Sequence, residues 1–274
     1  MIVDLKVMSV CNFDCAYCMN FNLGYSNIQS SWYSIIDKLV DSHKVDAINL
    51  TGGEPLLCDE IVEIVNYAKE RGLKVIVSTN GSLLDIKRMK ELSNVDIFNI
   101  GIDSFDVDIC KESGFEPKGA KYITKEHFKA IIENCKDVKV TTVVHCDNKF
   151  DLSVSSVLKE ENISEWVIQN CQYRGEDYYE GDIDHSGSYS NIYHCISDED
   201  FFDYVNNNLT NINCDFRVKG GMCGFLFETK CKDMNIKISY GEEYLPCMIH
   251  KNGDVYIGGE LKFNIITNDF DIGG

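Results

Sequence analysis

The chain has 274 residues, 44% of them hydrophobic, and a formal net charge of −18, so it can bury one large core while its surface repels nucleic-acid backbones. The N-terminal residues lack the pattern of a secretory signal, and no stretch is apolar over the length that crosses a bilayer. These properties disfavour nucleic-acid and membrane partners and predict a cytoplasmic protein, in which thirteen cysteines indicate metal ligands more readily than disulfides.

The first two thirds of the chain alternate between short β-branched runs and amphipathic stretches of helical period. The expected strands are Val3–Met8, Ala47–Leu50, Lys74–Ser78, Ile97–Ile102, Lys139–Val144 and Trp166–Cys171. The expected helices are Trp32–Val40, Ile61–Arg71, Ile86–Leu92 and Glu126–Cys135, and Gly72 is placed to end the second of them. This alternation predicts a parallel sheet with helices outside. Because six units fall short of the eight that close a barrel, we expect an α/β partial (βα)6 barrel over residues 1–171.

Beyond residue 171 the strand–helix alternation stops. Residues 172–213 are typical of a connector, with one helix expected over Asp198–Leu209 and capped by Ser197 or Asp198. Residues 214–274 combine short strand patterns, glycine turns and four cysteines, which predicts a small β-rich, cysteine-containing appendage.

The most informative motif is C-x3-C-x2-C at Cys11, Cys15 and Cys18, directly after the first expected strand. Thiolates are the usual ligands of iron–sulfur clusters, and three of them leave one iron of a four-iron cluster open to a small molecule. The next three strands lead into the small polar loops Gly52-Gly53-Glu54, Ser78-Thr79-Asn80-Gly81 and Gly101–Asp106. Carboxyl ends of parallel strands meet at one rim, so these loops should line one pocket.

With these motifs in this order and spacing, residues 1–171 resemble the radical S-adenosylmethionine (SAM) enzymes. The resemblance implies that Cys11, Cys15 and Cys18 hold a [4Fe-4S] cluster whose open iron is chelated by the amino and carboxylate groups of SAM. It further implies that an electron donor such as flavodoxin or ferredoxin reduces the cluster. SAM would then be cleaved to a 5′-deoxyadenosyl radical that removes hydrogen from a substrate.

The SAM contacts that the resemblance implies lie in the cysteine loop and in the loops after the second to fifth strands. They are Tyr17, Gly52, Gly53, Glu54, Ser78, Asn80, Asp103, Ser104 and Asn148. Backbone oxygens of the Gly-Gly-Glu motif would meet the amino group, and the polar residues of the third and fourth loops would face the ribose or the carboxylate. Relatives often carry serine where this chain has Gly101, which departs from the family pattern. No catalytic side chain is assigned.

The C-terminal cysteines leave two alternatives open. The segment Tyr244–Tyr256 resembles the SPASM or twitch appendage of radical SAM maturases, but Gly258-Gly259 replaces the expected Pro-Cys. The resemblance therefore implies a reduced appendage, with a second iron–sulfur cluster held by some of Cys223, Cys231 and Cys247. The alternative is that these cysteines are buried apolar residues or free thiols.

The substrate follows from the resemblance rather than from the residues. The maturase-like hairpin predicts a peptide or protein substrate. A second resemblance, to GTP 3′,8-cyclase, rests on the terminal Gly273-Gly274 and implies a nucleotide instead, although Met234 stands where that family has a cysteine. A third reading is an iron–sulfur protein that binds SAM without turning it over.

Overall fold

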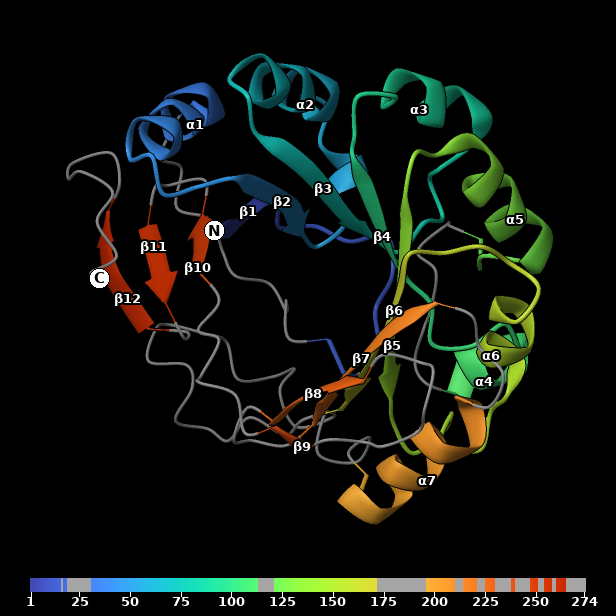
Figure 1. Ribbon diagram of the computed structural model, residues 1–274. Helices are drawn as coiled ribbons and strands as arrows, with labels where there is room; N and C mark the ends of the chain where they lie inside the picture. The colour runs from blue at the N-terminus through green and yellow to red at the C-terminus, as the bar shows by residue number, and fades with distance from the viewer. Residues whose placement is uncertain are drawn as a thin grey trace.

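The computed structural model describes residues 1–15, 17–18, 31–112, 121–171, 196–209, 214–220, 225–229, 238–239, 247–250, 254–257 and 260–264. The central strands are β1 (Ile2–Met8), β2 (Ala47–Gly52), β3 (Lys74–Thr79), β4 (Ile97–Gly101), β5 (Val138–Val144) and β6 (Glu165–Asn170). The helices are α1 (Trp32–Asp41), the 3-10 turn η1 (Pro55–Leu57), α2 (Ile61–Glu70), α3 (Ile86–Glu91), α4 (Val107–Glu112), α5 (Lys125–Asn134), α6 (Ser153–Leu158) and α7 (Asp198–Asn208). Figure 1 shows α1, α2, α3 and α5 in an arc outside the strands.

Strands β1 to β6 pair in chain order, and every pair is parallel, which confirms the α/β fold expected from the sequence. Every expected helix is present, including α7, whose N-cap Ser197 accepts a hydrogen bond from the Asp200 N–H. Gly72 ends α2 with φ of +87°, a conformation that glycine adopts without a steric penalty. Two further short helices, α4 and α6, were not predicted from the sequence.

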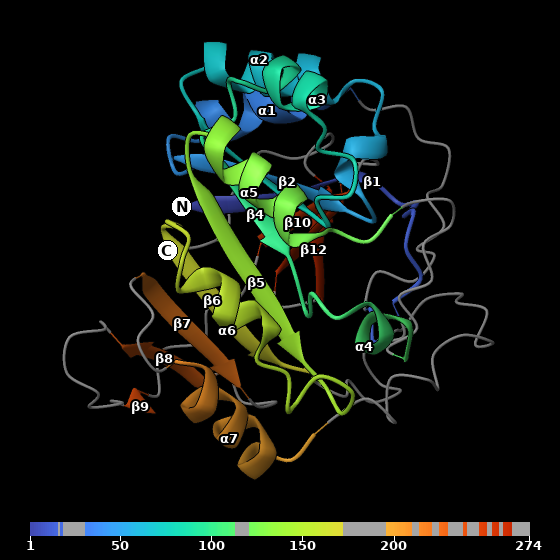
Figure 2. The same ribbon diagram turned by 90° about the vertical axis from the view of Figure 1, so that its right-hand side faces the viewer.

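The C-terminal region adds strands to both edges of this sheet. They are β7 (Asp215–Gly220), β8 (Phe225–Thr229), β9 (Ile238–Ser239), β10 (Cys247–His250), β11 (Asp254–Ile257) and β12 (Glu260–Asn264). Strand β7 pairs parallel with β6, and β10 pairs parallel with β1, while the remaining pairs are antiparallel (Figure 2). The division into residues 1–171, 172–213 and 214–274 stays a prediction. Cys223 and Cys231 lie outside the described residues, and Cys247 is the first residue of β10.

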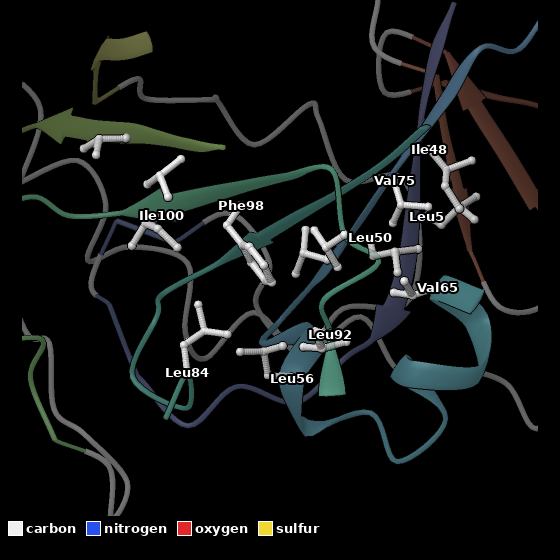
Figure 3. Close-up of a cluster of buried hydrophobic side chains, with 14 of the residues drawn as sticks. Leu5, Ile48, Leu50, Leu56, Val65, Val75, Leu84, Leu92, Phe98 and Ile100 are labelled. Carbon is white, nitrogen blue, oxygen red and sulfur yellow. The ribbon is translucent and has the colours of Figure 1, made fainter. Parts of the chain in front are cut away.

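The hydrophobic core lies between the sheet and its outer helices. Alternate residues of each strand point into it. Figure 3 shows Leu5, Ile48 and Val75 near Val65 of α2, while Phe98 is buried in the same core towards Ile100. Within the described ranges, none of the helices combines the length and the apolar character that a bilayer crossing requires.

Truncation of this core should destabilise the chain. Ile48 is fully buried, so Ile48→Ala should lower the free energy of unfolding by about 2–5 kcal/mol, through lost transfer energy and the cavity left behind. Phe150 is 80% exposed, and Phe150→Ala should change the free energy of unfolding by less than about 0.5 kcal/mol. Urea unfolding followed by circular dichroism compares the two. Equal effects would contradict this placement of the core.

Candidate active site at the rim of the barrel

The cysteine loop follows β1 directly. Cys11, Cys15 and Cys18 are partly buried, and the Cys18 N–H donates to the Cys15 carbonyl at 3.0 Å. The sulfur of Cys11 accepts from the Phe13 N–H at 3.4 Å. Burial is the main cause that raises the pKa values of the Cys11 and Cys15 thiols, and the neighbouring sulfurs raise them further. The metal-free loop therefore holds neutral thiols, and metal binding must displace their protons.

The Gly-Gly pair after β2 lets two backbone segments touch. The Gly53 N–H donates to the Met8 carbonyl at 2.7 Å, and the Glu54 N–H donates to the Val10 carbonyl at 2.9 Å. A Cβ atom at Gly53 would overlap the Val10 carbonyl and lie 2.9 Å from the Cys11 nitrogen. Gly52 has φ of +141°, and a Cβ there would overlap the Met8 carbonyl. These two glycines therefore set the path of the chain into the cysteine loop.

The side chain of Glu54 joins the loops after β2 and β3. It is fully buried, and it accepts hydrogen bonds from the Leu56 N–H at 2.9 Å, the Thr79 hydroxyl at 2.6 Å and the Asn80 N–H at 2.9 Å. Burial raises the pKa of Glu54, while these three donors act in the opposite direction. The carboxylate thus points into the protein, so any contact of Glu54 with SAM would come from its backbone.

Asn80 joins the β3 loop to the cysteine loop. Its amide nitrogen donates to the Asn12 side-chain oxygen at 2.9 Å and lies 3.9 Å from the Cys11 sulfur. Ser82 completes the group, accepting from the Asn12 amide at 2.9 Å and donating to the Asn80 oxygen at 2.6 Å. Asn12 and Ser82 were not predicted from the sequence, because isolated polar residues in a loop carry no signal of their spatial partners.

A second group joins the cysteine loop to the ends of β4 and β5. The Tyr17 hydroxyl donates to the Asp103 carboxylate, whose other oxygen accepts the Val143 N–H at 2.7 Å. The Tyr17 ring stacks on His145, with ring centroids 5.1 Å apart. Burial raises the pKa of Asp103 to about 7, whereas its hydrogen-bond donors lower it. His145 was not predicted as a site residue.

Asn148 braces this second group from within. Its amide nitrogen donates to the carbonyls of Asp103 at 3.0 Å and Val143 at 2.9 Å, and its oxygen accepts the His145 N–H at 2.8 Å. It is fully buried, so in this arrangement it shapes the loops that carry Asp103 and His145. Its direct contact with SAM stays a prediction.

Two other predicted contacts face different neighbours. Ser104 is buried, and its hydroxyl accepts the Asp106 N–H at 2.8 Å and lies 3.4 Å from the Ser153 hydroxyl at the start of α6. Ser78 lies on the inner face of the sheet, where its hydroxyl donates to Asn49 of β2 at 2.9 Å. Their contacts with SAM also stay predictions.

The donor set suits a cluster rather than a single ion. Within the described ranges, no three Cys, His, Asp or Glu side chains converge as they would around one metal ion. The ligands of a [4Fe-4S] cluster each bind a different iron and need not converge on one point. Three thiols on one loop, with N–H groups directed at the Cys11 sulfur, fit such a cluster.

Adding one methyl group at Gly53 should disturb the cysteine loop. Gly53→Ala should cost about 1–3 kcal/mol of stability by overpacking and should lower the iron and sulfide bound per chain after anaerobic reconstitution. Gly101→Ala is the matched control, since its nearest neighbour would be the Thr79 carbonyl at 3.8 Å. Wild-type iron content in Gly53→Ala would show that the loop does not depend on this contact.

Asp103 should make the stability of the metal-free chain pH-dependent. Its pKa is 3.8 in the absence of a folded environment and about 7 when folded. Between these two pH values the folded chain binds more protons than the unfolded chain. The free energy of unfolding should therefore fall as pH rises through this window, by on the order of 4 kcal/mol. Asp103→Asn should remove that slope in urea unfolding from pH 4.5 to 8, whereas Asp203→Asn, at an exposed position of α7, should keep it. An unchanged slope in Asp103→Asn would contradict this assignment.

Comparison with known proteins places these motifs in a family. The profile described as Radical SAM superfamily matches residues 5–151, more than half of the chain. An S-adenosylmethionine-dependent nucleotide dehydratase from Selenomonas ruminantium is 31% identical over 176 residues, which are 61% of this chain and 64% of the relative. A probable GTP 3′,8-cyclase from Sulfurisphaera tokodaii is 34% identical over 177 residues, 61% of this chain and 53% of the relative.

A structural neighbour extends over more of the chain. SuiB from Streptococcus suis bound to S-adenosylmethionine superimposes with a TM-score of 0.71 at 16% identity, covering 98% of this chain and 64% of SuiB. The chain thus spans less than two thirds of the length of the relatives named here, and at this identity the likeness to SuiB shows the fold alone. These comparisons confirm the expected fold and the cofactor pair of a [4Fe-4S] cluster and SAM. The chain belongs to the radical SAM superfamily.

Proposed function

We propose that this chain uses a [4Fe-4S] cluster, held by Cys11, Cys15 and Cys18, to cleave SAM reductively and to abstract hydrogen from a substrate. The observation that carries this proposal is the direct hydrogen bonding of the cysteine loop to the loops after β2 and β3. The Gly53 N–H donates to the Met8 carbonyl, and the Asn80 amide donates to the side-chain oxygen of Asn12, which lies next to Cys11 in the chain. A protein that only carried a cluster would need the cysteines but not the polar loops around them.

The cofactors supply the reactive chemistry, in which one electron from a reductant such as flavodoxin or ferredoxin breaks a carbon–sulfur bond of SAM. The residues of the chain bind and orient SAM. The backbone of Gly52, Gly53 and Glu54 and the side chain of Asn80 are proposed to hold the methionine part of SAM. Tyr17 and Asp103 are proposed to hold its nucleoside part, and their mutual hydrogen bond already fixes the cysteine loop against β4.

A nucleotide is the substrate class that the sequence relatives favour. The two relatives described above, at 31% and 34% identity, are named as a nucleotide dehydratase and a GTP 3′,8-cyclase. Their alignments cover 61% of this chain. The similarity therefore concerns the part of the chain that carries the cofactor motifs and part of the barrel interior.

A peptide or protein substrate is the second candidate. It rests on the C-terminal hairpin, in which β10 begins at Cys247 and pairs parallel with β1, so that Cys247 lies near the start of β1, at the end away from the cysteine loop. SuiB has also been solved with its precursor peptide SuiA bound, and that structure matches 98% of this chain at 16% identity. An auxiliary cluster that includes Cys247 would belong to this second candidate.

Reduction with dithionite under anaerobic conditions tests the proposed activity. The reconstituted chain should release 5′-deoxyadenosine from SAM, and the variant with Cys11, Cys15 and Cys18 all replaced by alanine should release none. Cys135→Ala, at a partly buried position that ends α5, should behave as wild type. Liquid chromatography quantifies the product, alongside iron and sulfide content. An intact cluster without 5′-deoxyadenosine would favour a non-catalytic SAM-binding protein.

A further inference from the structure

The inner face of the barrel carries a row of hydrogen-bonded polar side chains, one from each of five adjacent strands. We call Asp4, Asn49, Ser78, Asn99 and Thr141 the polar row. Thr141 donates to the Asn99 oxygen at 2.8 Å, and the Asn99 amide donates to the Ser78 hydroxyl at 3.2 Å. Ser78 donates to the Asn49 oxygen at 2.9 Å, and the Asn49 amide donates to the Asp4 carboxylate at 2.8 Å.

The polar row faces away from the helices. In each of β2 to β5, a residue adjacent in sequence to the member of the polar row points into the core on the opposite face. These adjacent residues are Leu50, Val77, Ile100 and Val140, and all four are fully buried. Every member of the polar row is partly exposed instead. Barrels of parallel strands usually fill their interior with branched apolar side chains. A partly exposed polar row in that position is therefore unsuited to a purely packed interior.

All four hydrogen bonds point in the same direction, from Thr141 towards Asp4. Bonds aligned in this way polarise one another and hold each side chain in a single orientation. Each asparagine uses its oxygen and one amide hydrogen inside the row. Within the described ranges, the second amide hydrogen of Asn49 and of Asn99 has no acceptor, and the Thr141 oxygen has no donor. The row thus offers two fixed donors and one acceptor.

One ion pair lies beside the row. Lys139, on the same face of β5 as Thr141, pairs with Glu165 of β6 at 2.9 Å between nitrogen and oxygen. The unused groups of the row are amides and a hydroxyl, which bind neutral carbonyl and hydroxyl groups without a change in charge. The row also runs into the site, because Ser78 stands two residues before Asn80 and Asn99 lies on the strand that leads to Asp103.

We propose that the polar row binds the uncharged base and ribose of a nucleotide substrate, with Asn49 and Asn99 as the residues that determine specificity. The inference rests on the proposed function and names the part of the substrate that the polar row binds. A nucleobase edge presents carbonyl oxygens or ring nitrogens as acceptors for the two amide donors, and a ribose hydroxyl can donate to Thr141. A site built to hydrogen-bond such groups discriminates strongly against ligands that lack them.

Isothermal titration calorimetry under anaerobic conditions tests the proposal on the reconstituted full chain with SAM present. The probes are ATP, GTP, CTP, UTP and inorganic tripolyphosphate. At least one nucleotide should bind, and Asn49→Asp and Asn99→Asp should each weaken it about tenfold or more, because each replaces an amide donor by a charged acceptor of the same shape. Asn94→Asp is the matched control, since Asn94 is an exposed amide bonded to Asn66 at 2.8 Å, and it should bind as wild type. Iron content and circular dichroism verify folding.

Four results would overturn the proposal. They are wild-type affinity in both variants, tripolyphosphate binding as tightly as the nucleotide, an equal loss of SAM affinity that would assign the row to the cofactor, and a peptide substrate bound in place of any nucleotide. The proposed function is tested separately, by wild-type release of 5′-deoxyadenosine from SAM. If that release occurs and no nucleotide binds, the inference fails and the proposed function stands.

Discussion

The whole site depends on a close backbone contact between the ends of β1 and β2. The Gly53 N–H bonds to the Met8 carbonyl at 2.7 Å, and neither Gly52 nor Gly53 has room for a side chain. Because Cys11 follows within three residues of Met8, this contact determines where the cysteine loop begins. The glycines therefore have a structural role that precedes any contact with SAM: they allow two strand ends to lie together at the rim.

Buried carboxylates extend that contact across the rim. Glu54 holds the end of β3 through hydrogen bonds from Thr79 and Asn80, and Asp103 holds Tyr17 of the cysteine loop against β5. Each carboxylate is desolvated, which raises its pKa and would destabilise its charged form without those donors. A loop held at several strand ends by such bonds keeps its sulfur atoms in place before any metal arrives. This preorganisation suits a site that must exclude side reactions of a radical.

Much of the fold could be predicted from the local periodicity of hydrophobic residues in the sequence. The strands and long helices followed from alternation and helical spacing, and the rim loops followed from the rule that parallel strands end together. What periodicity cannot show is which distant residues pair. Strands β7 and β10 read as parts of one appendage, yet they join opposite edges of the sheet. Ser104 and Asn148 matched the family pattern, and only the structure shows that the Ser104 hydroxyl bonds within its own loop and that the Asn148 amide bonds to Asp103 of another loop. The polar row was invisible for the same reason, since its members are separated by 21 to 45 residues in the chain.

Electron paramagnetic resonance of the reduced chain, with and without SAM, tests the central claim most directly. Three cysteine ligands with one open iron predict a paramagnetic signal of a reduced [4Fe-4S] cluster that changes when SAM binds, and that is lost when Cys11, Cys15 and Cys18 are replaced together. A signal indifferent to SAM would contradict an open iron at this site. Purified protein that holds zinc, or a disulfide among these three residues, would contradict the cluster itself.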